Sequence, residues 1–169
     1  GKEVEYKSVS ESEEAGIAIV HQELNMMNDL TVAQNLFIGQ ERMNGFFIND
    51  RKMEKDAEEL FKKLNVDINP GAKIGELTVG KQQMVEIAKA ISTNAKVIVF
   101  DEPTAALSTS EIEELFKVIR DLREKGAGII YISHRMDEIN VISDRVTVMR
   151  DGEYVGTLIT KDCTKDDII

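Results

Sequence analysis

A chain of 169 residues, 42% of them apolar, is long enough for one compact domain with a hydrophobic core, which argues against disorder. The 31 acidic residues outnumber the 21 basic ones and give a net charge of −10, which disfavours binding to nucleic acid or to an anionic lipid surface. No apolar run approaches the roughly 18 to 20 residues that cross a bilayer, and the charged N-terminus is unlike a signal peptide, so we expect neither a membrane-spanning nor an exported chain.

The first half of the chain predicts one strand followed by a helical block. Residues 16–20 are almost continuously apolar, which is typical of a parallel strand that helices cover on both faces. Apolar residues then recur at helical spacing over 53–64 and again over 84–91. We therefore expect a mostly helical insertion over 30–91, set into an α/β sheet.

The second half predicts two more buried strands, at 97–100 and 129–132, with a helix between them. Ser108 and Glu111 have the spacing of a capping box and mark the start of that helix, which should end near Gly126. Alternating strands and helices of this kind indicate an α/β fold with a parallel sheet.

The C-terminal part predicts a β-hairpin. Residues 145–149 and 154–159 read as strands and flank Asp151 and Gly152. An Asp-Gly pair suits the positive backbone angles of a tight two-residue turn, so the two strands should pair with each other.

Two adjacent carboxylates, Asp101 and Glu102, directly follow the apolar run at 97–100. Open α/β sheets bind ligands at the carboxyl ends of their strands. There Asp101 could hold Mg²⁺, and Glu102 could polarise the water that attacks a γ-phosphate. The alternative is that the pair simply ends a strand and begins a loop.

A histidine and a glutamine follow the other two strands. His134 and Gln22 each come two residues after a predicted strand, so both should reach the same edge of the sheet as the carboxylates. His134 could bond the γ-phosphate and orient water, and the neutral amide of Gln22 could contact both Mg²⁺ and the water. Taken alone, each could equally be an ordinary packing or surface residue.

A turn of small and polar residues precedes the helical pattern at 84–91. Its residues are Leu77, Thr78, Val79, Gly80 and Lys81. The backbone N–H groups near Gly80, the Thr78 hydroxyl and the positive end of the helix dipole could meet a phosphate. The alternative is an ordinary capped helix.

Four segments, taken in chain order, resemble the Q-loop, signature, Walker B motif and switch histidine of ATP-binding-cassette (ABC) ATPases. They are Gln22, Leu77-Thr78-Val79-Gly80-Lys81, Asp101-Glu102-Pro103-Thr104 and Ser133-His134. The sequence around Gln22, over 82–90 and over 131–136 is further similar to the first nucleotide-binding domain of bacterial importers of ribose, galactose and xylose.

The resemblance implies a fold and its division into parts. Residues 1–169 would be a partial ABC nucleotide-binding domain with the parallel sheet of P-loop NTPases. Residues 1–22 and 96–169 would belong to the α/β core, and about 23–95 would form the helical subdomain that carries the signature.

The resemblance also implies the cofactors, ATP and Mg²⁺, and the role of each residue. Glu102, His134 and Gln22 would be catalytic, and Asp101 and Gln22 would bind Mg²⁺. The signature residues Leu77, Thr78, Val79, Gly80 and Lys81 would contact the ATP held by the opposite domain.

Three departures from the family pattern stand out. The Walker A loop, G-x-x-x-x-G-K-[ST], has no match in the chain, and family order places it upstream of Gln22. We therefore expect an N-terminally truncated domain that is active only within a longer parent. The signature differs from L-S-G-G-Q at three positions, and Ser108 stands where many members carry Asp in the D-loop.

By the same resemblance, the parent would couple ATP hydrolysis to import of a monosaccharide. Its partners would be a second nucleotide-binding domain, permease subunits that contact residues 30–37 after Gln22, and indirectly a sugar-binding protein, but no nucleic acid. It would lie on the cytoplasmic face of the cell membrane, and the single cysteine, Cys163, fits a reducing compartment. The alternative is a catalytically inert module that only contacts other subunits, and residues 30–37 could equally be a packed helix.

Overall fold

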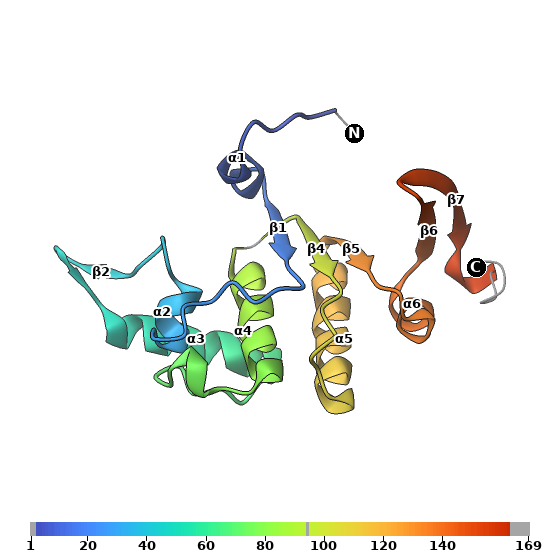
Figure 1. Ribbon diagram of the computed structural model, residues 1–169. Coiled ribbons are helices and arrows are strands. Elements are labelled where there is room, and N and C mark those ends of the chain that lie inside the picture. The colour runs from blue at the N-terminus through green and yellow to red at the C-terminus, as the bar shows by residue number, and fades with distance from the viewer. Residues whose placement is uncertain (1–2, 94, 163–169) are drawn as a thin grey trace.

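The structure is a computed structural model that describes residues 3–93 and 95–162 (Figure 1). Cys163 lies outside the described residues. Within the described part of the chain, no helix is both long and apolar enough to cross a bilayer.

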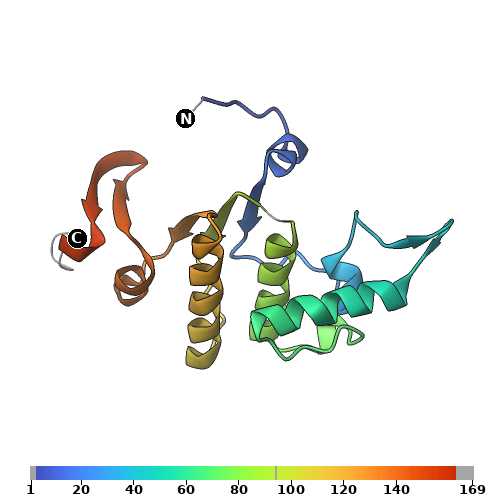
Figure 2. The same ribbon diagram turned by 180° about the vertical axis from the view of Figure 1, so that it is seen from behind.

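The centre of the molecule is a parallel sheet of three strands in the order β1-β4-β5 (Figures 1 and 2). The strands are β1 (Ile17–Val20), β4 (Val97–Asp101) and β5 (Gly128–Ile132). Both pairings are parallel and in continuous register, from Ile17 opposite Val97 to Asp101 opposite Ile132. The predicted parallel strands are confirmed, and their carboxyl ends lie at one edge of the sheet.

Two long helices, α4 (Val79–Ser92) and α5 (Thr109–Glu124), lie side by side against one face of this sheet (Figures 1 and 2). The strands turn alternate side chains toward them, and these side chains are buried in β1 and β4 and partly buried in β5. Val20 and Phe100 are fully buried and share one core with Ile87 and Leu115 of the helices. Burial of an apolar side chain of this size stabilises the fold by about 1.5–3 kcal/mol.

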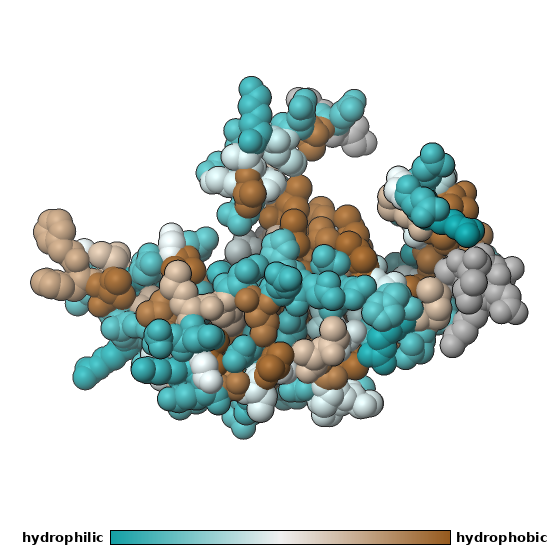
Figure 3. Space-filling model, in the orientation of Figure 1, coloured by the Kyte–Doolittle hydropathy of each residue, from teal (hydrophilic) through white to brown (hydrophobic). Residues whose placement is uncertain are grey.

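No helix of the described residues covers the opposite face of the sheet, which differs from the prediction of helices on both faces. Ile19, Ile130 and Ile132 remain 47%, 52% and 47% exposed. Figure 3 shows the apolar surface they belong to, between α1 (Val9–Glu14) and the C-terminal hairpin. Both α4 and α5 pack on the same side, so within the described residues only one face of the apolar strands is buried.

The predicted helical block over 30–91 is confirmed, with one addition. It contains α2 (Val32–Leu36), α3 (Asp50–Leu64), a 3-10 turn (Ile74–Glu76) and α4. The addition is a small antiparallel hairpin of β2 (Met43–Asn44) and β3 (Phe47–Ile48), which projects from the block and exposes Phe46 completely. Strands of two residues are too short to show an alternating pattern in the sequence.

The second half also follows the sequence closely. The capping box at Ser108 and Glu111 begins α5, and the chain leaves α5 through Gly126, which has a positive φ of 92°. The hairpin of β6 (Arg145–Arg150) and β7 (Glu153–Ile159) turns at Asp151 and Gly152 with φ values of 52° and 82°. A short helix before it, α6 (Met136–Ile142), was not predicted.

Glu86 is an acidic residue buried inside this fold. It lies on α4 with 8% of its surface exposed, and its Oε2 finds no hydrogen-bond partner among the described residues. Burial raises the pKa of this carboxyl above its usual value, against smaller lowering effects of Lys89 and His21. A group with a raised folded-state pKa stabilises the fold fully below its unfolded pKa, and that contribution is lost as the pH rises through the folded pKa.

We therefore expect Glu86→Gln to raise the free energy of unfolding above pH 7 and to lose this advantage near pH 4, because the amide never carries a charge. Urea unfolding of the unmodified protein and of Glu86→Gln, at about pH 8 and about pH 4, measures the difference in their free energy of unfolding. Glu58→Gln, on the exposed side of α3, is the matched control. A gain that is the same at both pH values would contradict the prediction.

Candidate active site

Three of the predicted site residues come together at the carboxyl edge of the sheet. Gln22 follows β1, Glu102 follows β4 and His134 follows β5. The Gln22 Nε2 donates to Glu102 Oε2 at 3.2 Å, and His134 Nδ1 lies 3.0 Å from Glu102 Oε1. One carboxylate is therefore held between an amide and an imidazole, an arrangement that can orient a water molecule and accept its proton.

Glu102 reaches this position through an unusual backbone turn. Its φ is 43°, in the left-handed region that non-glycine residues seldom adopt. Its N–H donates to the carbonyl of Ile132 at 3.0 Å, just beyond the last paired residues of β4 and β5. The Glu102 side chain is 28% exposed and that of His134 is 76% exposed, so the pair is open to a ligand from solvent.

Asp101 lies next to this cluster but is not bonded to it. It is the last residue of β4, is half-buried, and makes no side-chain hydrogen bond or ion pair with the residues that the structure describes. Nor do the described residues contain a group of three His, Cys, Asp or Glu side chains that could hold a metal ion by themselves.

The signature turn has the geometry of a capped helix. Thr78 is the N-cap of α4, and its hydroxyl accepts from the N–H of Lys81 at 3.4 Å. Val79 and Lys81 are exposed, whereas Leu77 is half-buried. The first turn of α4 lies at the end of the helix that points away from the sheet (Figure 1), so it is separate from the cluster around Glu102.

Gly80 is buried because another acidic side chain packs against it. A Cβ at Gly80 would lie 2.8 Å from Oε2 and 2.9 Å from Oε1 of Glu111. The same Oε2 accepts hydrogen bonds from the N–H and the hydroxyl of Ser108, at 2.8 and 2.7 Å. The capping box of α5 thus fills the space beside Gly80, a contact that local sequence patterns do not reveal.

The segment after Gln22 is mostly packed inside the molecule. In α2 and its C-cap, Val32, Ala33, Leu36 and Phe37 are buried, and the Asn35 amide bonds to both backbone polar groups of Met27. The packed-helix alternative therefore describes most of residues 30–37. The partly exposed side chains of the segment are Leu30, Thr31 and Gln34.

One buried carboxylate beside the cluster was not predicted. Glu138, in the first turn of α6, has a side chain only 2% exposed and an ion pair with Arg135. Acidic residues are common near helix N-termini because of the helix dipole, so this position gave no distinctive sequence signal. Its place four residues after His134 was the available clue.

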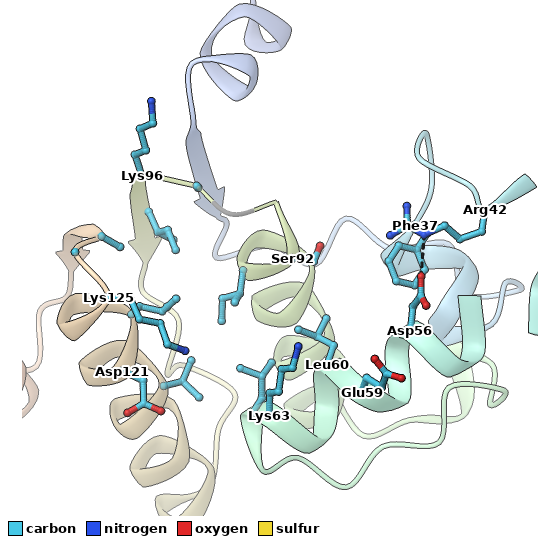
Figure 4. Close-up of a pocket in the computed structure, with 18 residues that line it drawn as sticks. Phe37, Arg42, Asp56, Glu59, Leu60, Lys63, Ser92, Lys96, Asp121 and Lys125 are labelled. Carbon is cyan, nitrogen blue, oxygen red and sulfur yellow. Dashed lines mark hydrogen bonds and ion pairs between the residues drawn. The ribbon is translucent and has the colours of Figure 1, made fainter. Parts of the chain in front are cut away.

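A groove of about 630 Å³ lies elsewhere, among the ends of α3, α4 and α5 (Figure 4). It is lined by Lys96 and Ala127, which precede β4 and β5, so it faces the amino ends of the strands. Its charges are mixed, and Arg42 is already paired with Asp56 at 2.8 Å and lies over the Phe37 ring. The groove contains none of the predicted site residues.

Comparison with known proteins places the chain in a family. A family model described as "ABC transporter" matches residues 1–105. The chain belongs to the ABC transporter family.

Relatives cover the whole of this ABC chain. It is 52% identical over 171 aligned positions to a ribose/galactose/methyl galactoside import ATP-binding protein of Burkholderia cenocepacia. It is 46% identical to the galactose/methyl galactoside import ATP-binding protein MglA of Pasteurella multocida and 48% identical to the ribose import ATP-binding protein RbsA of Halalkalibacterium halodurans. The alignments cover 100% of this chain, which spans about a third of the length of these relatives.

Solved structures agree with the α/β fold. A nucleotide-free ATP-binding cassette from an ABC transporter matches with a TM-score of 0.75 and 27% identity. An ADP conformation of an ATP-binding cassette matches with a TM-score of 0.73 and 28% identity. Each match covers 90% of this chain and 64% of the other.

Alanine in place of glycine inside a helix normally stabilises it by about 0.5–1 kcal/mol. We expect Gly80→Ala instead to lower the free energy of unfolding by about 0.5–1 kcal/mol, because its Cβ would displace the carboxylate of Glu111 and disturb the capping box of α5. Urea unfolding measures the change.

The same substitution in a Glu111→Ala background is the control. With that carboxylate gone, Gly80→Ala should become neutral or stabilising, and a double-mutant cycle isolates the contact. If Gly80→Ala has the same effect in both backgrounds, Glu111 is not the reason for the glycine.

Proposed function

We propose that the chain is part of the ATP-hydrolysing subunit of an ABC importer for monosaccharides, in which ATP hydrolysis drives import. The observation that carries the proposal is the Glu102 carboxylate held between Gln22 and His134 at the carboxyl edge of a parallel sheet. Relatives about half identical in sequence, named as sugar import ATP-binding proteins, support it. Because the chain spans a third of their length, the proposal concerns the longer parent protein.

In this proposal Glu102 polarises the attacking water and accepts its proton. His134 bonds the γ-phosphate and orients the water from the other side of the same carboxylate. The amide of Gln22 would contact both the water and Mg²⁺. Most of the rate enhancement in phosphoryl transfer comes from positioning and electrostatic stabilisation, which is what these fixed contacts supply.

Mg²⁺ would be held by Asp101 and Gln22. The donor set suits it, since Mg²⁺ prefers oxygen ligands and takes few of them from protein. Gln22 donates its amide N–H to Glu102, which leaves its Oε1 as a ligand atom. Phosphate and water oxygens would complete the coordination.

The signature would act in a second nucleotide-binding domain's site. The first turn of α4 supplies free N–H groups and the Thr78 hydroxyl, with Leu77, Val79, Gly80 and Lys81 around it, for the ATP bound by the opposite domain. We assign this turn to a helical subdomain at about 23–95, and the strands β1, β4 and β5 to the α/β core at 1–22 and 96–169.

The membrane-side partners would be permease subunits. A sugar-binding protein would be an indirect partner through these subunits. Contact would use the partly exposed side chains of the segment after Gln22, namely Leu30, Thr31 and Gln34. The parent would then lie on the cytoplasmic face of the membrane as a peripheral subunit. The net charge of −10 disfavours a nucleic-acid partner.

The test is ATP hydrolysis by the parent protein, purified at the length of its relatives. We expect steady hydrolysis, and a fall of about 100-fold or more for Glu102→Gln, which keeps the shape of the side chain but removes the base. Glu153→Gln, exposed on β7, should leave the rate unchanged. A parent that hydrolyses ATP equally well with Glu102→Gln would refute the assigned role.

The second candidate is a non-catalytic interaction module. It is favoured for the 169 residues alone because they contain no G-x-x-x-x-G-K-[ST] loop. In P-loop proteins that loop supplies most of the contacts that bind the phosphates of ATP. We expect calorimetric titration of this chain with ATP and Mg²⁺ to show no binding, and no ATPase activity above background. Hydrolysis that Glu102→Gln abolishes in this same chain would mean that the phosphate site lies within the 169 residues.

A further inference from the structure

A buried carboxylate joins the two segments that carry the candidate catalytic pair. The Oε2 of Glu138 accepts hydrogen bonds from Thr104 at 3.0 Å, from Tyr131 at 2.8 Å and from Ser133 at 3.2 Å. Its Oε1 lies 2.7 Å from Nη1 of Arg135. With a side chain only 2% exposed, this carboxylate depends on these partners to offset the loss of water.

The partners of Glu138 flank both members of the pair. Thr104 comes two residues after Glu102, and Ser133 directly precedes His134. Thr104 is itself 3% exposed, so its hydroxyl has no solvent to bond instead. A single oxygen therefore connects the loop that follows Glu102 to the end of the strand that precedes His134.

The turn at Glu102 needs such support. A non-glycine residue with a φ of 43° is strained, and strain of this kind persists only where the surroundings hold it. On one side the N–H of Glu102 is bonded to Ile132. On the other side Pro103 is buried and Thr104 is bonded to Glu138, so the turn is fixed from both ends.

We propose that Glu138 is a positioning residue of the site, which holds the Glu102 turn and His134 at the distance that hydrolysis requires. The proposal rests on the function proposed above and adds a residue that does not touch the reacting atoms. Its effect on the reaction is exerted through Thr104, Tyr131 and Ser133.

The hydrogen bonds have a fixed direction, which sets this network apart from simple packing. Burial, together with the hydrogen bond to Glu138 and its charge, raises the pKa of Tyr131 above its usual value, so its hydroxyl stays protonated and remains a donor. Three hydroxyl donors converge on one acceptor oxygen. An amide at position 138 has about the same shape, but it carries no charge and would place its donor hydrogens against the guanidinium of Arg135 or against the three hydroxyl donors.

The experiment uses the parent protein and the variants Thr104→Val, Tyr131→Phe and Glu138→Gln. Each keeps its volume and removes hydrogen bonds of the network. We expect kcat for ATP hydrolysis to fall by about 10- to 100-fold, because small displacements of catalytic groups cost this much, while KM for ATP stays within about twofold. Thr104→Val and Tyr131→Phe keep Glu138, so they decide the matter even if Glu138→Gln fails to fold.

Two control variants make the same chemical changes away from the site. Thr147→Val and Tyr154→Phe remove hydroxyls that bond to Thr157 in the exposed hairpin of β6 and β7. Their kcat should equal that of the unmodified parent. A loss of activity equal to that of the site variants would overturn the proposal.

Hydrogen exchange of the parent gives a reading that needs no activity. The amide of Glu102, bonded to Ile132, should exchange about tenfold faster or more in the three site variants, while amides in the middle of β4 keep their rates. Uniform acceleration along β4, or none, would show that Glu138 only contributes to general stability. An unmodified parent without ATPase activity would refute the proposed function, and exchange at Glu102 would then decide alone whether Glu138 holds the turn.

Discussion

The site depends on the parallel pairing of β1, β4 and β5. Because the three strands run in one direction, the residues that follow them meet at one edge, although Gln22, Glu102 and His134 are far apart in sequence. An antiparallel neighbour would send its following residue to the opposite edge, about 16 Å away for a strand of five residues. The buried apolar side chains of the strands pack against the helices on one face of the sheet, and this packing stabilises the pairing.

The sheet brings the segments together, but it does not aim their side chains. The conformation of the loops sets the orientation of these side chains. Glu102 leaves β4 with a positive φ, which strains the backbone, and buried polar contacts offset that strain. The Glu102 side chain then faces both Gln22 and His134, whereas Asp101, one residue earlier and still within the strand, stays outside the bonded cluster. Adjacent carboxylates thus occupy different surroundings because one is in regular backbone and the other is not.

Patterns that repeat along the chain predicted most of the fold. Apolar runs located the strands, helical spacing located α3 and α4, and the capping box located the start of α5. What local patterns could not predict are contacts between segments distant in sequence, such as Glu111 against Gly80. Coverage of the sheet was mispredicted for a related reason, since an apolar strand such as β5 indicates burial without indicating which element supplies it.

The two candidate sites are joined by one stretch of chain, from Glu102 to Glu111. Glu102 belongs to the cluster at the sheet edge, and Glu111 packs against Gly80 in the signature turn. Between them, Thr104 is bonded to Glu138 and the capping box fixes the entry to α5. Each end of this stretch is held by its own buried or capping contacts, so the stretch connects the two sites and is fixed at both ends. Ala105 and Ala106 in the middle of the stretch are exposed, and backbone hydrogen bonds from Ala105 to Glu102 and from Leu107 to Thr104 fold that middle part into turns.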